Sequence, residues 1–338
     1  MAPSRFPFLL GCNYPWTLLN GVSNYGRDVG VTPEGIHTGL STRRDLVAHD
    51  FASMRSLGLN VLRWFMFCDG RAGIRFDAHG LPAGLTERAF ADLDAAVDLA
   101  ARNDLLLIPV LFDYLWMFNR IENRDARGNL VYSAPGHGEV MKSAAGRRAL
   151  MDRIILPVLD RYAASKSIFA WEFMNEPDWV VSGPDLDRTN VPDPIGFEEY
   201  CALVWEAGFE VHARTSARYT LGTARAQSLV RWSQANLGVD FLQVHAYEDF
   251  WKRGHDVSIR GKRPEDLGVD LPMVVGEYPV NGQGMDGFVD EVERNGFAGA
   301  LFWSFNNVDR CGVESVERIG AVLSAAAPRI ASKRAGLA

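Results

Sequence analysis

Ile168-Phe169-Ala170-Trp171-Glu172-Phe173-Met174-Asn175-Glu176-Pro177 is the stretch of sequence that decides the fold. Its first seven residues are apolar except for Glu172, which is typical of a parallel strand covered on both faces. Pro177 ends such a strand because it has no backbone N–H to give to the ladder. We therefore predict that Glu176 lies at the C-terminal end of a buried strand, with the amide of Asn175 beside it.

Seven further apolar runs resemble this one, and helical patterns separate most of them. The seven runs lie at 8–14, 59–66, 105–112, 218–222, 240–247, 272–278 and 299–305. Eight repeats of strand and helix predict an α/β fold, a single (β/α)8 TIM barrel that spans residues 1–338 as one catalytic domain. Three long segments follow strands and are expected as loops on the C-terminal face, where barrels of this kind build their active sites: 113–142, 177–196 and 247–271.

Apolar stripes with a helical period predict four of the helices. Thr42 and Asp45 resemble a capping box at the start of the first helix, and Thr86 is expected to cap the second. After the sixth strand the pattern is weaker, and 248–271 is predicted as loop with at most one short helix. The stripes comprise Leu46, Phe51, Met54 and Leu57; Phe90, Leu93, Val97 and Ala100; Leu150, Ile154, Val158 and Tyr162; and Tyr200, Leu203, Val204, Ala207 and Val211.

The composition, 47% hydrophobic and 23% charged over 338 residues, is that of a soluble globular chain. The formal charge of −7 is spread without long blocks of like charge, so neither nucleic acid nor a membrane is expected as a partner. No stretch of about 18 apolar residues predicts a membrane span. Residues 1–10 lack the apolar run of a secretory signal, which favours a cytoplasmic location; a leader removed from the natural protein would leave no trace here.

The four cysteines, Cys12, Cys68, Cys201 and Cys311, have no spacing of the zinc or redox kind. We expect free thiols in a reducing compartment. A disulfide between Cys12 and Cys311 is the less favoured alternative, because the first and last strands of a closed barrel are neighbours.

A second carboxylate ends the seventh predicted strand, in Val274-Val275-Gly276-Glu277-Tyr278. Strands four and seven face each other across the mouth of an eight-stranded barrel, so Glu176 and Glu277 should meet there. Glycoside hydrolysis requires such a pair, one carboxyl group protonated to release the leaving oxygen and one ionised to attack the anomeric carbon. For a retaining enzyme we predict a separation of about 5–5.5 Å between them.

Residues on neighbouring strands are expected to support this pair. Arg63 should contact Glu277 and hold its pKa below that of Glu176, because a nearby cation favours the ionised carboxylate. Tyr247 should donate a hydrogen bond to Glu277. His245 is expected to orient either Glu277 or the substrate.

Other polar and aromatic residues near the strand ends are assigned structural or sugar-binding roles. Glu172 lies deeper on the same strand face as Glu176, and we interpret it as a buried carboxylate paired with Arg63 or a lysine. Trp303, in the eighth strand, is expected to form the floor of the sugar subsite beside the scissile bond. The remaining candidates for sugar contacts are Asn13, Trp16, Asp113, Tyr114, Trp116, Trp179 and Trp251.

These residues, taken in chain order, resemble glycoside hydrolase clan A, and within it family 5, which contains cellulases and β-mannanases. The resemblance rests on Arg63, Asn175-Glu176-Pro177, His245-Ala246-Tyr247, Glu277 and Trp303, and it covers nearly the whole chain. It implies that Glu176 is the acid/base and Glu277 the nucleophile. Many family members carry a histidine at the end of the third strand, where this chain has Asp113, so Asp113 is expected to bind a sugar hydroxyl in its place.

The predicted activity is therefore retaining hydrolysis of a β-linked oligo- or polysaccharide of the mannan or glucan type, with no metal and no organic cofactor. A catalytically silent carbohydrate-binding barrel is one alternative. A metal-dependent sugar isomerase or aldolase is another, since such barrels also carry Glu and His at strand ends.

Overall fold

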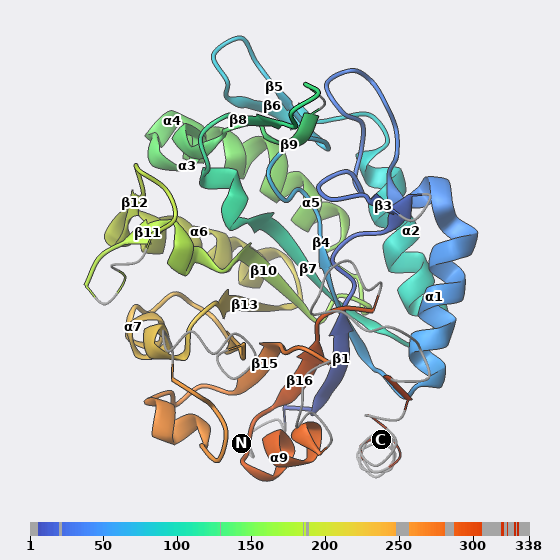
Figure 1. Ribbon diagram of the computed structural model, residues 1–338, viewed down its shortest axis with the longest axis vertical. Coiled ribbons are helices and arrows are strands. Elements are labelled where there is room, and N and C mark those ends of the chain that lie inside the picture. The colour runs from blue at the N-terminus through green and yellow to red at the C-terminus, as the bar shows by residue number, and fades with distance from the viewer. Residues whose placement is uncertain are drawn as a thin grey trace.

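The computed structural model describes residues 6–305, except 20–21, 129, 185, 187–188, 248–256 and 281–286, together with residues 319, 320, 323, 328 and 330. Eight parallel strands form a closed barrel in the order β1-β16-β15-β14-β13-β10-β7-β4 (Figure 1). No strand extends more than one residue beyond its predicted run, which confirms the predicted barrel. The strands are β1 (Leu9–Asn13), β4 (Val61–Phe65), β7 (Leu106–Asp113), β10 (Ala170–Asn175), β13 (Arg218–Thr223), β14 (Phe241–His245), β15 (Met273–Glu277) and β16 (Gly299–Phe302).

The barrel interior changes from apolar to polar toward the C-terminal ends of the strands. An apolar cluster near the N-terminal ends contains Leu9, Val61, Ile108, Phe169, Ala170, Phe241, Val274 and Leu301. Two residues further along their strands, Arg63 and Glu172 are fully buried in the centre, and Gln243 lies beside them. This polar layer supports the residues at the barrel mouth.

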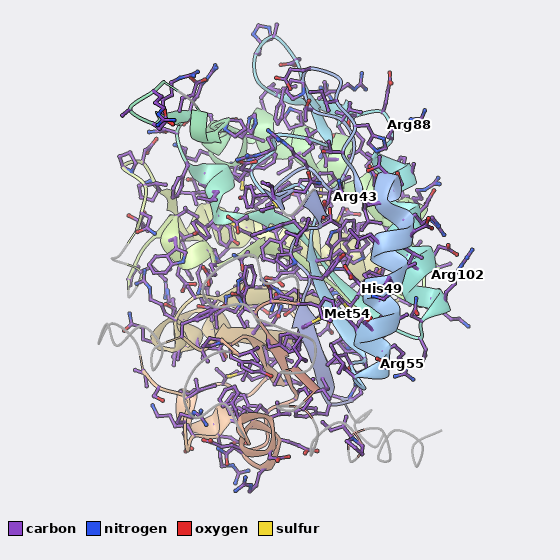
Figure 2. All side chains as sticks on the ribbon, turned by 45° about the vertical axis from the view of Figure 1, so that its right-hand side comes forward. Arg43, His49, Met54, Arg55, Arg88 and Arg102 are labelled. Carbon is purple, nitrogen blue, oxygen red and sulfur yellow. The ribbon has the colours of Figure 1, made fainter. Side chains whose placement is uncertain are left out.

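Helices cover the outside of the barrel and bury the predicted stripes against it (Figure 1). The third stripe is buried throughout, although it runs through an α-helix, a π-helical turn and a second α-helix. In Figure 2, Met54 points from α1 toward the strands, whereas Arg55 points to solvent. The helices are α1 (Arg44–Ser56), α2 (Ala89–Arg102), α3 (Gly138–Lys142), α4 (Ala144–Leu150), the π-helix η3 (Met151–Ile155), α5 (Leu156–Arg161), α6 (Phe197–Arg214), α7 (Leu229–Gln234) and α9 (Phe288–Arg294).

Details at the starts of α1 and α2 differ from the prediction. Thr42 lies inside a 3-10 turn, η1 (Leu40–Arg43), where its hydroxyl donates to the Gly39 carbonyl, so it does not cap α1. Thr86 does not cap α2, because its hydroxyl accepts a hydrogen bond from the backbone N–H of Val31. Leu46, predicted in the first apolar stripe, is 45% exposed.

The long segments after the strands form small elements at the C-terminal mouth. Two antiparallel hairpins, β5–β6 and β8–β9, lie together at the top of Figure 1. The described part of the connection after β14 contains one 3-10 turn, η6 (Pro264–Leu267), as predicted. The other small elements in the segments that follow the barrel strands are β2 (Leu18–Leu19), β3 (Val22–Ser23), β5 (Ile74–Phe76), β6 (Pro82–Leu85), η2 (Tyr114–Met117), β8 (Ile121–Arg124), β9 (Leu130–Ala134), η4 (Pro177–Trp179), β11 (Val181–Ser182), β12 (Ile195–Gly196) and η5 (Ala226–Ser228).

Two further expectations concern the thiols and the membrane. Cys12, Cys68 and Cys201 are buried free thiols, and Cys311 lies outside the described residues. Within the described part of the chain, no helix combines the length and the apolar character needed to cross a bilayer.

Candidate active site

Glu176 and Glu277 meet at the barrel mouth. Glu277 is the last residue of β15 and Glu176 directly follows β10. One oxygen of each carboxylate and a ring nitrogen of His245 all lie within 4.8 Å of one another. This approach is close enough for a retaining pair, whose carboxyl groups lie roughly 5–5.5 Å apart, whereas an inverting pair holds them roughly 6.5–9.5 Å apart.

The backbone at Glu176 is held in an unusual conformation. Its φ of 50° and ψ of 54° lie in the left-handed region, which non-glycine residues seldom occupy. Pro177 follows at the start of η4, and the Glu176 N–H donates to the carbonyl of Gly222 on β13 at 3.0 Å. The turn that ends β10 therefore aims the Glu176 side chain across the barrel mouth, at a conformational cost that the surrounding contacts offset.

Glu176 contacts two hydrogen-bond donors. Its Oε1 lies 2.7 Å from His245 Nδ1, and its Oε2 accepts from the indole N–H of Trp179 at 2.8 Å. Burial alone would raise the pKa of Glu176, but the hydrogen bond and charge of His245 lower it, and the Trp179 indole adds to this effect. The other His245 nitrogen, Nε2, has no hydrogen-bond partner among the residues that the structure describes, so Nδ1 is the ring nitrogen that faces both carboxylates.

Glu277 makes both predicted contacts. Arg63 Nη1 donates to its Oε1 at 2.6 Å, and the Tyr247 hydroxyl donates to its Oε2 at 3.0 Å. Burial nevertheless raises the pKa of Glu277, and the positive charges of His245 and Arg63 offset this only in part. Our prediction that the pKa of Glu277 lies below that of Glu176 is therefore wrong for the substrate-free site, because His245 hydrogen-bonds to Glu176 rather than to Glu277.

The guanidinium of Arg63 is the centre of the buried polar layer. It makes a two-point ion pair with Glu172, with contacts of 2.7 and 2.6 Å, as interpreted from the sequence. Gln243 Nε2 also donates to Glu172 at 2.7 Å. Gly222 makes room for this cluster, since a Cβ there would lie 2.7 Å from a Glu172 oxygen and 3.0 Å from His245 Nε2. Arg63 is thus fixed from below by Glu172 while it holds Glu277 above.

Asn13 does not contact sugar as predicted. It is completely buried, its amide N–H groups donate to the Gly276 and Phe302 carbonyls, and its Oδ1 accepts from Arg63 at 3.0 Å. These bonds tie β1 to β15 and β16 and leave no group for a ligand. Asn13 therefore helps to position Arg63.

Asn175 and Asp113 continue the same chain of hydrogen bonds. Asn175 Oδ1 accepts from Arg63 at 2.7 Å, and its Nδ2 donates to Asp113 at 2.9 Å. Burial raises the pKa of Asp113 to about 7. One N–H of the Asn175 amide is not used in these two bonds, so it is available to a sugar hydroxyl.

An aromatic wall lies beside the carboxylates. Trp303 packs edge-on against Trp16 and Phe65, with ring centroids 5.8 and 5.9 Å apart, and Tyr25 lies 5.0 Å from Trp16. Trp303 is 9% exposed, and Trp16 is partly exposed. Sequence reasoning missed Phe65 and Tyr25. Phe65 could have been found, since it lies two residues after Arg63 on the same strand face, but Tyr25 lies in a long loop without a periodic signal.

The remaining aromatic candidates have different outcomes. Trp116 is completely buried and packs against Phe112, with ring centroids 4.7 Å apart, so its predicted role in sugar binding is wrong. Trp179 reaches the site and carries the Arg225 guanidinium 4.4 Å above its ring. Trp251 lies outside the described residues. Tyr114, at the start of η2, is partly buried, and its ring is tilted by 58° to that of Phe118, with centroids 5.9 Å apart.

The chain is similar to known proteins in sequence and in fold. The chain is 22% identical over 337 residues to a mannan endo-1,4-β-mannosidase of Mytilus edulis, over 89% of this chain and 84% of the relative. The solved endo-1,4-β-mannanase of Eisenia fetida superposes with a TM-score of 0.75 at 18% identity, over 94% of this chain and 90% of that one. A glycoside hydrolase family 5 mannosidase of Rhizomucor miehei superposes with a TM-score of 0.57 at 14% identity, over 97% and 95%.

No protein-family model matches the chain. The relatives nevertheless confirm what the site residues indicated: the chain resembles the β-glycoside hydrolases of clan A, and within that clan the mannanases of family 5.

Proposed function

We propose that this protein hydrolyses β-1,4-linked mannan with retention, with Glu277 as nucleophile and Glu176 as acid/base. The observation that carries the proposal is the close pair of carboxylates at the barrel mouth, each with its own hydrogen-bond donors. Retaining glycosidases need this arrangement, because the nucleophile and the proton donor must act on one glycosidic bond from opposite faces.

In the first step a Glu277 oxygen attacks the anomeric carbon and Glu176 protonates the departing oxygen. His245 Nδ1 lies 2.7 Å from Glu176 Oε1, so transfer of a proton from His245 to Glu176 leaves a neutral imidazole and a carboxylic acid. Arg63 and Tyr247 hold Glu277 in the orientation for attack and stabilise its ionised form.

In the second step water attacks the glycosyl ester of Glu277. Esterification removes the negative charge of Glu277, so the repulsion that opposes ionisation of Glu176 is lost. Glu176 then accepts a proton from the attacking water, and the product leaves with the anomeric configuration of the substrate.

Mannan is proposed as the substrate because the relatives that cover most of this chain are mannanases by name. The test is to incubate the protein with β-1,4-mannohexaose and, separately, with the matching β-1,4-glucan hexasaccharide, and to follow the first products by NMR. We expect mannohexaose to be cut into shorter oligosaccharides whose new ends first carry the β anomer. An initial α anomer would contradict retention, and cleavage of the glucan alone would contradict the substrate.

A metal-dependent sugar isomerase is the rival that has an observation behind it, because Glu176, His245 and Glu277 are close enough to share a metal ion. The contacts favour the glycosidase, since the oxygens of both carboxylates already accept hydrogen bonds from protein donors. We expect activity on mannohexaose to survive dialysis against a chelator. Activity that is lost and then restored by a divalent cation would support the rival.

Replacing Trp179 with phenylalanine should move the basic limb of the pH dependence of kcat/KM to higher pH. The indole N–H stabilises ionised Glu176, so its loss raises the pKa of Glu176 and keeps the general acid protonated at higher pH. The measurement is kcat/KM against pH for a mannooligosaccharide. An aryl mannoside whose leaving group needs no protonation is the control and should show no shift. An unchanged basic limb with the mannooligosaccharide would show that Glu176 is not the group that limits activity at high pH.

A further inference from the structure

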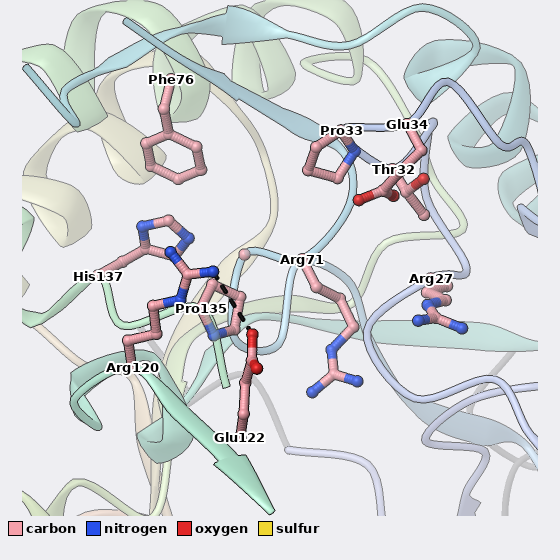
Figure 3. A pocket seen from close by; sticks show the side chains of 11 residues that line it. Arg27, Thr32, Pro33, Glu34, Arg71, Phe76, Arg120, Glu122, Pro135 and His137 are labelled. Carbon is pink, nitrogen blue, oxygen red and sulfur yellow. Dashed lines mark hydrogen bonds and ion pairs between the residues drawn. The ribbon is translucent and has the colours of Figure 1, made fainter. Parts of the chain in front are cut away.

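A cavity of about 290 Å³ lies at the barrel mouth, next to the site already described (Figure 3). Its walls come from the segments that follow β1, β4 and β7, including the hairpins β5–β6 and β8–β9. Figure 3 shows Phe76, His137 and Arg120 on one side, Pro33 and Glu34 on the other, and Arg71 between them. The volume is near the lower end for small-ligand sites, roughly 300–1,000 Å³, which suits a short piece of a glycan.

The wall that follows β1 is held rigidly by two buried carboxylates. Asp28 accepts hydrogen bonds from the Thr17 backbone at 2.7 Å and from Asn24 at 2.6 Å. Asp92, which belongs to α2, accepts from the backbone N–H groups of Gly30 and Ser41 at 2.7 and 2.9 Å. This wall is therefore ordered before a ligand binds, which reduces the entropy lost on binding.

The chemistry of the lining fits an uncharged sugar. The guanidiniums of Arg27, Arg71 and Arg120 are matched by the carboxylates of Glu34 and Glu122 in the lining. A third carboxylate, that of buried Asp69, pairs with Arg71 behind the wall, so the local charges balance and an acidic ligand gains little. Sugar hydroxyls both donate and accept hydrogen bonds, so guanidinium donors and carboxylate acceptors around one cavity serve them well.

An aromatic pair adds an apolar surface. The rings of Phe76 and His137 are parallel, with centroids 3.9 Å apart, and both are partly exposed. Burial lowers the pKa of His137 to about 4, so at neutral pH its uncharged ring offers one donor and one acceptor. The apolar face of a sugar ring can lie against this pair while its hydroxyls reach the charged groups.

The cavity connects with one side of the active site. Arg71 lies 4.9 Å over the ring of Tyr25, and the Tyr25 hydroxyl is 3.5 Å from Asp113. Tyr25 also contacts Trp16, which packs on Trp303 beside Glu277. In the proposed mechanism this side of the active site holds the glycon, which is the part of the substrate that becomes attached to Glu277. The leaving group lies toward Glu176.

From this geometry we propose that the cavity is a distal glycon subsite, which binds one neutral sugar unit of the β-linked chain that is cleaved between Glu176 and Glu277. The inference rests on the proposed function and adds to it a preference for longer chains on the glycon side. Each substrate that reaches the cavity gains contacts with Phe76 and Arg120 that shorter substrates cannot make.

The test uses 4-nitrophenyl β-mannosides with one to five β-1,4-linked mannosyl units, because these differ only in glycon length. For the unchanged protein we expect kcat/KM to rise by about tenfold, equivalent to 1.4 kcal/mol, at the length that first reaches the cavity. Phe76→Ala and Arg120→Ala should remove most of that step and leave the shorter substrates unaffected. Arg124→Ala is the matched control. Arg124 is exposed on β8, which directly follows Arg120, and it also pairs with Glu122, but it does not line the cavity.

The outcomes separate the two proposals. A step that survives in both cavity variants, or no step at any length in the unchanged protein, overturns the distal subsite while leaving the glycosidase intact. Equal losses at every length overturn it as well, because the residues would then act through the fold or the carboxylates. If the unchanged protein cleaves none of the aryl mannosides or mannohexaose, the proposed function itself fails, and the subsite fails with it.

Discussion

Replacement of Glu277 with alanine should reduce hydrolysis by about 10⁴-fold or more on every substrate, since only binding and the remaining polar groups can then assist the reaction. Replacement of Glu176 with alanine should depend on the leaving group. Loss of proton transfer should slow cleavage of mannan by roughly 10²–10⁴-fold. An aryl mannoside with a good leaving group should still glycosylate Glu277, and the intermediate should accumulate because no base activates water.

Added azide should distinguish the two variants through the anomer it produces. In the Glu176→Ala variant, azide attacks the intermediate on Glu277 from the opposite face and should give a β-glycosyl azide. In the Glu277→Ala variant, azide takes the place of the nucleophile and should give an α-glycosyl azide. Product NMR measures the anomer, and Glu265→Ala, an exposed glutamate on η6, is the control that should leave activity unchanged.

Exchanged anomers would show that the two roles are reversed. Absence of rescue in both variants, with the fold intact by circular dichroism, would contradict double displacement. The directions of the two pKa shifts do not decide between these outcomes, because they describe the substrate-free site, in which His245 is hydrogen-bonded to Glu176.

Replacement of Arg63 with alanine should have the second large effect, on stability and activity together. It leaves Glu172 and Glu277 buried without the cation that pairs with both. Breaking a buried ion pair from one side costs roughly 3–5 kcal/mol in free energy of unfolding, which urea denaturation measures. The pKa of Glu277 should rise further, since Arg63 lowers it, so the acidic limb of kcat/KM should move to higher pH.

Arg63→Lys keeps the charge but cannot make the two-point contact with Glu172, so it should lose less stability than Arg63→Ala and remain folded for the pH measurement. Arg148→Ala is a suitable surface control, because its ion pair with Asp152 is exposed and is expected to contribute less than about 1 kcal/mol. An acidic limb that does not move in Arg63→Lys or Arg63→Ala would show that Arg63 supports the fold and not the ionisation of Glu277.

The sequence by itself determined the barrel and the meeting of the two carboxylates. Parallel strands buried on both faces appear as apolar runs, and their C-terminal ends share one edge, so Glu176 and Glu277 could be located from strand count alone. The contacts of Glu277 with Arg63 and Tyr247 followed for the same reason, as did the pairing of Glu172 with Arg63. Each depends only on which strand a residue ends and which face it shares.

Burial of individual residues in the loops and at strand ends was decided only by the tertiary structure. Asn13 and Trp116 follow the same local patterns as Trp16 and Trp179, yet the first two are completely buried. The cap residues Thr42 and Thr86 failed likewise, because their hydroxyls bond to backbone groups outside the predicted cap. What covers a side chain depends on segments that are distant in sequence, and local periodicity carries no information about them.

The relative pKa values of the two carboxylates and the cavity beside them also required the tertiary structure. His245 hydrogen-bonds to Glu176, which is 69 residues away in sequence. Its Nδ1 lies 2.7 Å from Glu176 Oε1 but 3.5 Å from Glu277 Oε1, and this small difference decides which carboxylate it contacts. The cavity combines short pieces of three loops, none of which has a motif of its own. Strand order follows from the pattern of hydrophobic burial, but charge balance and cavity shape follow from the positions of side chains, and only packing sets those positions.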